Sequence, residues 1–237
     1  MRIGIIGAME LEVNELISKM DIDAVIPYGG RKFYVGDING TEVVLARCGV
    51  GKVNAGSCVQ IMVDKFEIDA IINTGVAGSL DSSIDIGDFV LATNAVYHDL
   101  EATGFGYERG QVPQMDIFEF PMSDRLINIA ESACKKVNPD VKLFKGRVAS
   151  GDQFISAKEI KENIKKWFSP LCVEMEGAAM AHVAYLNGIE CLIIRAISDK
   201  ADDSAQVDYP VFEAKAAADC ARMVLEMMDV LAKEEEE

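Results

Sequence analysis

Residues 171–203 constrain the possible folds of this chain more than any other segment. Residues 172–174 are expected to be extended, 177–185 to form a helix of small residues, and 191–197 to form a strand. Asn187-Gly188 suits the left-handed cap that ends many helices. The last run is apolar and β-branched, which is typical of a buried parallel strand. The segment therefore predicts a strand–helix–strand unit of an α/β sheet.

Acidic residues follow both predicted strands. Glu174 and Glu176 flank Met175 after the first strand, and Ser198 and Asp199 end the second. Open α/β sheets bind ligands at the carboxyl ends of such strands, so this segment predicts the floor and one wall of an active site. Plainer interpretations remain open for single residues. Asp199 or Glu174 could cap a helix, Glu176 could be a surface acid, and Arg195 could neutralise one of them.

The composition excludes several classes of partner. The 237 residues carry 39 acidic and 23 basic side chains, a net charge of −16, which argues against nucleic acid and anionic membranes. With two histidines and no Cys-x-x-Cys pair, we expect no metal and no cofactor. The six cysteines indicate a reduced, cytoplasmic protein. Because the first residues become acidic by Glu10, we expect no signal peptide, and no apolar run approaches the ~18 residues of a membrane span.

The remaining pattern predicts one α/β domain over residues 1–237, with a solvated acidic tail at 234–237. Asn39-Gly40 between two β-rich runs predicts a hairpin, and hence a mixed sheet. Ser123 is expected to cap a helix, and residues 156–159 to form a capping box for another. The predicted strands are 3–6, 31–38, 41–46, 70–73, 89–95, 143–149, 172–174 and 191–197, and the predicted helices follow residues 8, 51, 123, 157, 176 and 208.

Two glycine-rich segments suggest a shared ligand cleft. Residues 48–55 read as a glycine turn into a helix, and residues 74–79 as a second turn after a buried strand. Backbone N–H groups at the first turn, which opens a helix, can hold an anion or ribose hydroxyls. That turn lacks the spacing of a P-loop, and residues 4–7 lack the third glycine of a dinucleotide fingerprint. The irregular, aromatic stretch 97–121 is predicted to be a lid or a subunit contact. Glu12 reads as a solvated helix-start acid or as a carboxylate leaning into the cleft.

Five motifs occur in order along nearly the whole chain: residues 4–10, 72–75, 150–152, 173–176 and 195–199. Together they resemble the 5′-methylthioadenosine/S-adenosylhomocysteine nucleosidases, within the wider nucleoside phosphorylase superfamily. The resemblance implies a central mixed sheet surrounded by helices and a homodimer. It also implies hydrolytic release of adenine from a 5′-thio-substituted nucleoside, without metal or cofactor.

The resemblance also implies roles for individual residues. Asp199, supported by Ser198, would protonate N7 of the leaving adenine, and Glu12, with Arg195 nearby, would activate the attacking water. Glu176 would bind the ribose hydroxyls beside Glu174, and Met175 would pack under the sugar. Phe154 would stack on adenine and the Ile155 backbone would read its edge. The 5′-thio pocket would be lined by Met9, Val50, Tyr107, Pro113 and Tyr209, with Phe105 supplied by the partner subunit.

Two residues depart from the family pattern. Val76 stands where many members carry a serine that holds the water, and Tyr209 stands where phenylalanine is common. Two other functions also stay open at this point. A purine nucleoside phosphorylase would need several cations at the glycine-rich loops, where only Lys52 and Arg195 are available. A non-catalytic adenosine-binding module would have no need for both Asp199 and Glu12.

Overall fold

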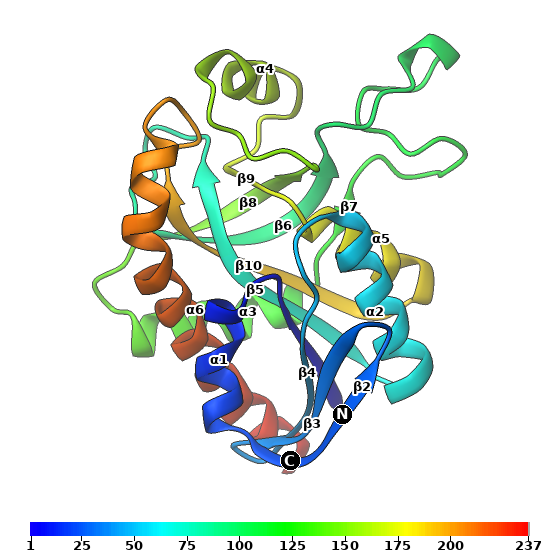
Figure 1. Cartoon of the computed structure of the whole chain (residues 1–237), viewed down its shortest axis with the longest axis vertical. Coiled ribbons are helices and arrows are strands. Elements are labelled where there is room, and N and C mark those ends of the chain that lie inside the picture. The colour runs from blue at the N-terminus through cyan, green and yellow to red at the C-terminus, as the bar shows by residue number, and fades with distance from the viewer. Residues whose placement is uncertain (237) are drawn as a thin grey trace.

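The computed structural model describes residues 1–236, which form a mixed sheet surrounded by helices (Figure 1). This confirms the predicted fold class. The strands are β1 (Arg2–Gly7), β2 (Asp21–Tyr28), β3 (Arg31–Ile38), β4 (Thr41–Arg47), β5 (Ala70–Ser79), β6 (Phe89–Tyr97), β7 (Phe120–Pro121), β8 (Leu143–Ser150), β9 (Cys172–Glu174) and β10 (Glu190–Asp199).

Four parallel strands form the centre of the sheet, in the order β4, β1, β5 and β10. The central strands are almost wholly buried runs of Ile, Val, Leu and Ala, as expected for strands covered on both faces. The β2–β3 hairpin extends the sheet beyond β4. On the other side, pairings from β10 through β6, β8 and β9 return to β5, so these five strands close a ring.

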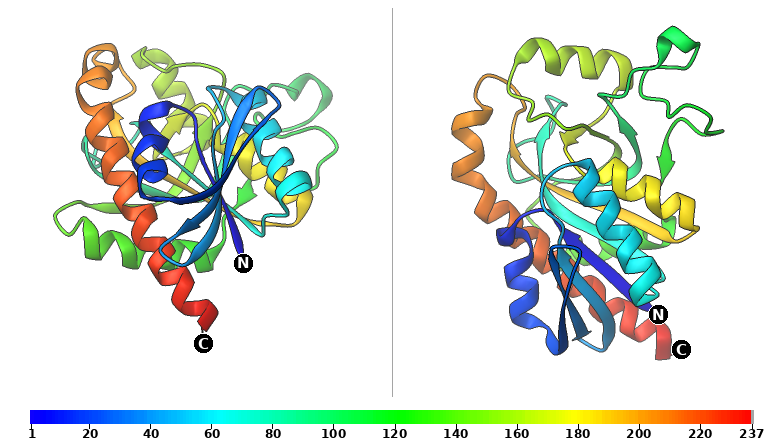
Figure 2. Two further views of the ribbon diagram at one scale, coloured as in Figure 1. Left: turned by 60° about the horizontal axis from the view of Figure 1, so that its bottom comes forward. Right: turned by 45° about the vertical axis from the view of Figure 1, so that its right-hand side comes forward.

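Helices cover the sheet on two sides (Figure 2). α2 and α5 pack together on one side, whereas α6 packs along α1 and α3 on the other. α4 lies apart, beyond one end of the sheet (Figure 1). The helices are α1 (Glu10–Lys19), α2 (Lys52–Phe66), α3 (Asp124–Val137), α4 (Lys158–Phe168), α5 (Gly177–Asn187) and α6 (Ala205–Glu236).

Two predicted helix ends are confirmed by the structure. The Ser123 hydroxyl accepts a hydrogen bond from the Leu126 N–H at 3.3 Å, which caps α3. Gly188 ends α5 with φ 67°, in the left-handed region that glycine adopts without strain. Within residues 1–236, no helix is both long and apolar enough to cross a membrane.

Two local predictions were wrong. Residues 74–79 continue β5 as a strand, because β10 pairs with it as far as Gly78. The capping box at 156–159 does not form, since α4 begins after Ala157 without a side-chain cap. The tail predicted at 234–237 stays a prediction, although α6 runs as far as Glu236 and Glu234 lies 3.0 Å from Arg125 in an ion pair. Glu237, the end of that predicted tail, lies outside the described residues.

Candidate active site

A cavity of about 200 Å³ lies where the carboxyl ends of the central strands meet. Its walls come from segments far apart in the sequence, including the start of α1, the last residues of β5, the end of β10 and the first turns of α6. It is lined by Ala8, Met9, Glu12, Val50, Val76, Ala77, Gly78, Phe154, Val173, Glu174, Met175, Glu176, Ser198, Asp199 and Tyr209.

Glu12 reaches into this cavity from the first turn of α1 and is only 4% exposed, which excludes the solvated interpretation. Its Oε2 accepts hydrogen bonds from the N–H groups of Ala8 (2.7 Å) and Met9 (2.9 Å), and its Oε1 from Val76 (3.2 Å). Burial raises the pKa of Glu12, opposed by the charge of Arg195 and by these N–H groups. A carboxylate with a raised pKa is suited to general-base catalysis near neutral pH.

Asp199 lies at the end of β10 and is 2% exposed. Its Oδ2 accepts the Ser198 hydroxyl at 2.9 Å and its Oδ1 accepts the Ala201 N–H at 2.8 Å. The second bond closes a local turn, well before α6 begins at Ala205. Burial raises the pKa of Asp199 despite both hydrogen bonds, which favours the protonated form needed by a general acid.

Two glycines of β5 make room for these carboxyl groups. A Cβ atom added at Gly75 would lie 2.5 Å from Oε1 of Glu12, and one added at Gly78 would lie 2.7 Å from Oδ1 of Asp199. These glycines therefore do not form the predicted turn after the strand. They allow two acidic side chains to approach the strand backbone closely.

Glu174 and Arg195 form a fully buried ion pair beneath the cavity, with Nη2 and Oε2 2.6 Å apart. The guanidinium also donates to the Asn73 side chain, and Ser150 donates to Glu174. Glu174 accepts the Gly177 N–H at 2.7 Å, so it caps α5 as one plain interpretation proposed. Although burial alone would raise its pKa, the Arg195 charge and the Ser150 and Gly177 hydrogen bonds hold the pKa of Glu174 below its usual range.

The pKa of Glu176 is shifted in the opposite direction to that of Glu174. Glu176 is 7% exposed, and the Gly51 N–H donates to its Oε1 at 2.7 Å. Burial, followed by the nearby charge of Glu174, raises the pKa of Glu176 to about 8. Two neighbouring carboxyl groups thus have pKa values shifted in opposite directions, a pattern found where acids serve different chemical roles.

Apolar side chains complete the cavity. The rings of Phe154 and Tyr209 meet edge to face, with centroids 5.7 Å apart. The Tyr209 hydroxyl donates to the Met9 sulfur at 3.1 Å, which joins α6 to the start of α1 across the cavity wall. Val50 and Met175 also line this cavity. Such a wall fits a flat base and an apolar 5′ substituent better than a charged group.

Several predicted site residues lie outside this cavity. Ile155 lines a small adjoining pocket together with Phe154 and Asp199. Arg195 lies below the cavity lining, bonded to Glu174 and Asn73. Phe105, Tyr107 and Pro113 belong to the long loop between β6 and β7, which projects away from the body of the molecule (Figure 1), and none of them lines the cavity.

Sequence reasoning missed four lining residues that contribute small side chains or backbone. These are Ala8, Ala77, Gly78 and Val173. It also missed the spatial role of Gly75. The available signal was the presence of two glycines, Gly75 and Gly78, in residues 74–79. We interpreted that segment as a turn after the strand.

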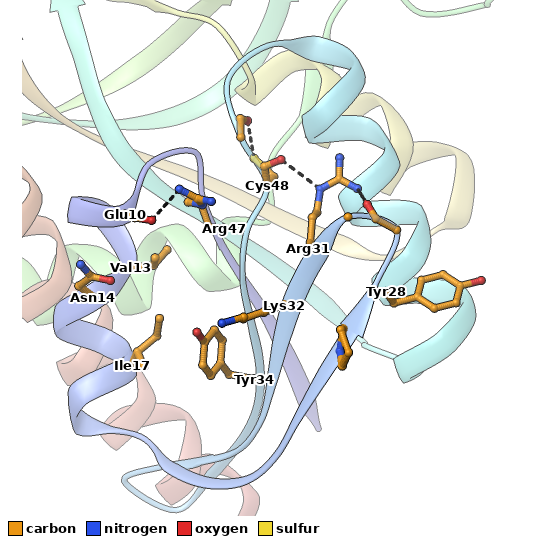
Figure 3. Close-up of a pocket in the computed structure, with 14 residues that line it drawn as sticks. Glu10, Val13, Asn14, Ile17, Tyr28, Arg31, Lys32, Tyr34, Arg47 and Cys48 are labelled. Atoms are coloured by element: carbon orange, nitrogen blue, oxygen red, sulfur yellow. Dashed lines mark hydrogen bonds and ion pairs between the residues drawn. The ribbon is translucent and has the colours of Figure 1, made fainter.

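A larger pocket of about 790 Å³ lies between α1 and the β2–β3 hairpin (Figure 3). Its one lining carboxylate, Glu10, is exposed and pairs with Arg47 at 2.9 Å. The Arg31 guanidinium is turned to the Cys48 carbonyl oxygen at 3.0 Å. This pocket therefore lacks the paired buried carboxyl groups of the smaller cavity. Among the described residues, no group of three or more His, Cys, Asp or Glu side chains could hold a metal ion.

Comparison with known proteins gives a consistent family. A profile described as "Phosphorylase superfamily" matches residues 2–229. The 5′-methylthioadenosine/S-adenosylhomocysteine nucleosidase of Halalkalibacterium halodurans is 45% identical over 225 residues, which cover 94% of this chain and 96% of that protein.

Solved structures agree with this result. The nucleosidase of the same name from Neisseria meningitidis, in complex with methylthio-immucillin-A, has a TM-score of 0.93 and 36% identity, covering 97% of this chain and 99% of that one. The futalosine hydrolase of Helicobacter pylori has a TM-score of 0.91 and 33% identity, covering 97% of each chain.

Proposed function

We propose a specific hydrolytic mechanism for the cavity of this chain, which belongs to the phosphorylase superfamily and, within it, to the 5′-methylthioadenosine/S-adenosylhomocysteine nucleosidases. The enzyme is a hydrolase of N-glycosidic bonds, and its substrates are adenine nucleosides with a 5′-thio substituent. One observation carries the mechanism: two buried carboxyl groups with raised pKa values line the same cavity. Glu12 comes from the first turn of α1, and Asp199 from the end of β10.

The chemistry requires both groups. Cleavage of an N-glycosidic bond develops positive charge on the ribose and negative charge on the leaving base. Asp199 in its protonated form donates to N7 of adenine, while Glu12 accepts a proton from the water that attacks the anomeric carbon. Glu176, in its ionised form, accepts hydrogen bonds from the ribose hydroxyls. Phe154 stacks on the base, and Met9, Val50 and Tyr209 receive the 5′ substituent.

Hydrolysis is favoured over phosphorolysis because the cations near the cavity, Lys52 and Arg195, are already paired with carboxylates. The Lys52 ammonium contacts both carboxylate oxygens of Asp99 at 2.7 Å, and Arg195 is paired with Glu174. Each of these two cations is thus already neutralised by a carboxylate. A phosphate dianion in the cavity would face Glu12, Glu174 and Glu176 without a free cation among the residues lining it.

The test is adenine release from methylthioadenosine, S-adenosylhomocysteine, 5′-deoxyadenosine and aminodeoxyfutalosine, with and without phosphate. We expect methylthioadenosine to release adenine at an unchanged rate in phosphate-free buffer and to yield the free 5-thioribose. A strict requirement for phosphate, with a ribose 1-phosphate product, would establish the phosphorylase alternative. Binding of the nucleosides without turnover would establish a non-catalytic adenosine-binding module.

We also infer that the chain acts as a homodimer through the side that carries α2 and α5. Val53 of α2 is 83% exposed, Leu186 of α5 is 64% exposed, and Phe105 in the projecting loop is 88% exposed. A groove of about 310 Å³ between these helices and the loop is lined largely by apolar atoms of Val53, Leu100 and Val183. In a dimer, Phe105 of one copy, with Tyr107 and Pro113, would reach the cavity of the other.

Sedimentation and a loop variant test the dimer. We expect a dimer at assay concentrations, and we expect Phe105→Ala to weaken binding of 5′-alkylthio substrates more than binding of adenosine. A fully active monomer would contradict the inference. We further propose a cytoplasmic location, which is supported by six free, buried cysteines, since thiols persist in reducing compartments.

A further inference from the structure

The N-terminus of α2 is built without a cap of its own. Its N-cap residue is Gly51, with φ 97°, and its first turn contains no acidic residue. The first helical residue is Lys52, a cation at the end of a helix where the dipole favours an anion. This helix end nevertheless faces the active site, because the Gly51 N–H donates to Glu176 at 2.7 Å.

Two acidic residues from other elements supply what α2 lacks. Asp152, in the loop after β8, accepts the Lys52 N–H at 2.9 Å and so acts as the missing cap. Asp99, just after β6, accepts the Lys52 ammonium on both oxygens at 2.7 Å. The Asp152 N–H donates in turn to Asp99 at 2.9 Å, so each of Lys52, Asp99 and Asp152 is hydrogen-bonded to the other two.

The cluster is compact and partly shielded from water. The side chains of Lys52 and Asp99 are 24% and 14% exposed, whereas Asp152 is 51% exposed. Glycines allow the close approach, since a Cβ atom at Gly51 would lie 3.1 Å from Asp152 Oδ1 and one at Gly151 would lie 3.0 Å from Asp99 Cγ. We call Lys52, Asp99 and Asp152 the α2 clamp.

We propose that the α2 clamp consists of positioning residues that hold the Gly51 N–H against Glu176, and thereby fix the orientation and charge of the carboxylate that binds the ribose hydroxyls. This inference rests on the proposed function for the role of Glu176. None of the three clamp residues lines the cavity. They act through one backbone hydrogen bond, from the start of α2, which the segments after β6 and after β8 hold in place.

The charges around Glu176 explain why this one bond matters. Burial and the charges of Glu174 on β9 and Glu12 on α1 raise its pKa to about 8, while the Gly51 N–H and Arg195 on β10 lower it. The neighbouring Cys48 thiol, whose pKa burial raises far above its usual range, stays neutral. Loss of the Gly51 bond would therefore raise the pKa of Glu176 further and leave less of it ionised at neutral pH.

The first test is Lys52→Met, which removes the ammonium and leaves Asp99 beside Asp152 without a cation. We expect the acidic limb of the kcat/KM profile for methylthioadenosine to move upward by about one pH unit, since that profile reports groups of the free enzyme. KM at neutral pH should rise about tenfold, with a smaller change in kcat. Asp99→Asn should shift both quantities in the same direction by less.

Lys135→Met is the matched control, because it also removes a lysine from an ion pair, but that pair lies on the exposed face of α3. It should leave the profile and KM unchanged. The charge of Glu176 can be followed without turnover by carbon-13 NMR of labelled glutamate carboxyl groups, with Glu176→Gln assigning the signal. Its midpoint should move upward in both clamp variants.

Three results would overturn the inference. The first is an unmoved Glu176 titration in Lys52→Met and Asp99→Asn, even if both variants unfold at lower temperature, which would make the cluster only structural. The second is additivity of Lys52→Met and Glu176→Gln in kcat/KM, since residues acting through one another are coupled. The third is an equal shift in Lys135→Met. If the parent enzyme released no adenine, the proposed function would fail, and the NMR titration would still decide the clamp.

Discussion

Gly75→Ala offers a sharp test of the site, because it disturbs Glu12 without changing any catalytic group. The added Cβ would lie 2.5 Å from Oε1, 3.1 Å from Cδ and 3.5 Å from Oε2 of Glu12. The carboxylate cannot move away freely, since three backbone N–H groups hold it at 2.7 Å, 2.9 Å and 3.2 Å. Either β5 shifts at residue 75, or the Glu12 carboxylate loses one or more of these three hydrogen bonds.

The expected magnitudes follow from that geometry. Overpacking of one methyl group costs about 1–3 kcal/mol. For a domain of this size, each 1 kcal/mol lowers the melting temperature by roughly 2–4 °C, so a decrease of about 2–12 °C is expected. A shift of about 1 Å in the general base should lower kcat about 10²-fold.

Adenine release and thermal unfolding should be measured on the same preparations, with Gly146→Ala as the control. A Cβ at Gly146 in β8 would lie 2.6 Å from the Leu171 side chain, so this variant is also crowded, but not against a carboxylate of the cavity. We expect it to lose stability and keep kcat. If Gly75→Ala lost stability to a similar extent and also kept kcat, the placement of Glu12 would be irrelevant to turnover and our reasoning would be refuted.

Three further predictions concern the carboxyl groups. Glu12→Gln should lower kcat for adenine release by roughly 10²–10⁴-fold, and near-native turnover would reject Glu12 as the base. Asp199→Asn should lower turnover by roughly 10²-fold or more while calorimetry still detects a non-hydrolysable methylthioadenosine analogue; a variant that lost binding but kept turnover would make Asp199 structural. The pKa of Glu176 is raised from 4.5 to about 8, so the folded state binds more protons in that window and stability falls as pH rises through it. Urea unfolding at about pH 5 and about pH 8 should therefore show a smaller loss of stability for Glu176→Gln than for the parent, and an equal loss would contradict the shift.

Much of the sheet could be predicted because its central strands are continuous apolar runs and its turns carry strong local signals. Asn39-Gly40 lies between β3 and β4, and Gly188 ends α5, as local chemistry requires. β5 was cut short in the prediction, because its second half is mostly glycine, alanine and serine, residues that are uncommon in strands. Pairing with β10 and burial of the whole strand outweigh that local preference.

The acidic residues of the site could be found from their positions at strand ends, whereas their relationships could not. The pairing of Glu174 with Arg195 was one of several interpretations of the sequence, and burial of both side chains at 2.6 Å decides it. The α2 clamp joins residues 47 and 100 positions apart, Lys52 with Asp99 and Lys52 with Asp152. No local pattern predicts such contacts, since they depend on how β6, β8 and α2 are brought together.

The position of β10 has a consequence for the synthesis of the chain. β10 lies between β5 and β6, so both strands lack one neighbour until residues 190–199 leave the ribosome. At about 5–20 residues per second, the interval between the end of β5 and the end of β10 is roughly 6–24 s. During that time an apolar strand edge is open to pairing with other chains. Ribosome-bound chains ending before residue 190 should therefore be the form of this protein most prone to aggregate and most dependent on chaperones.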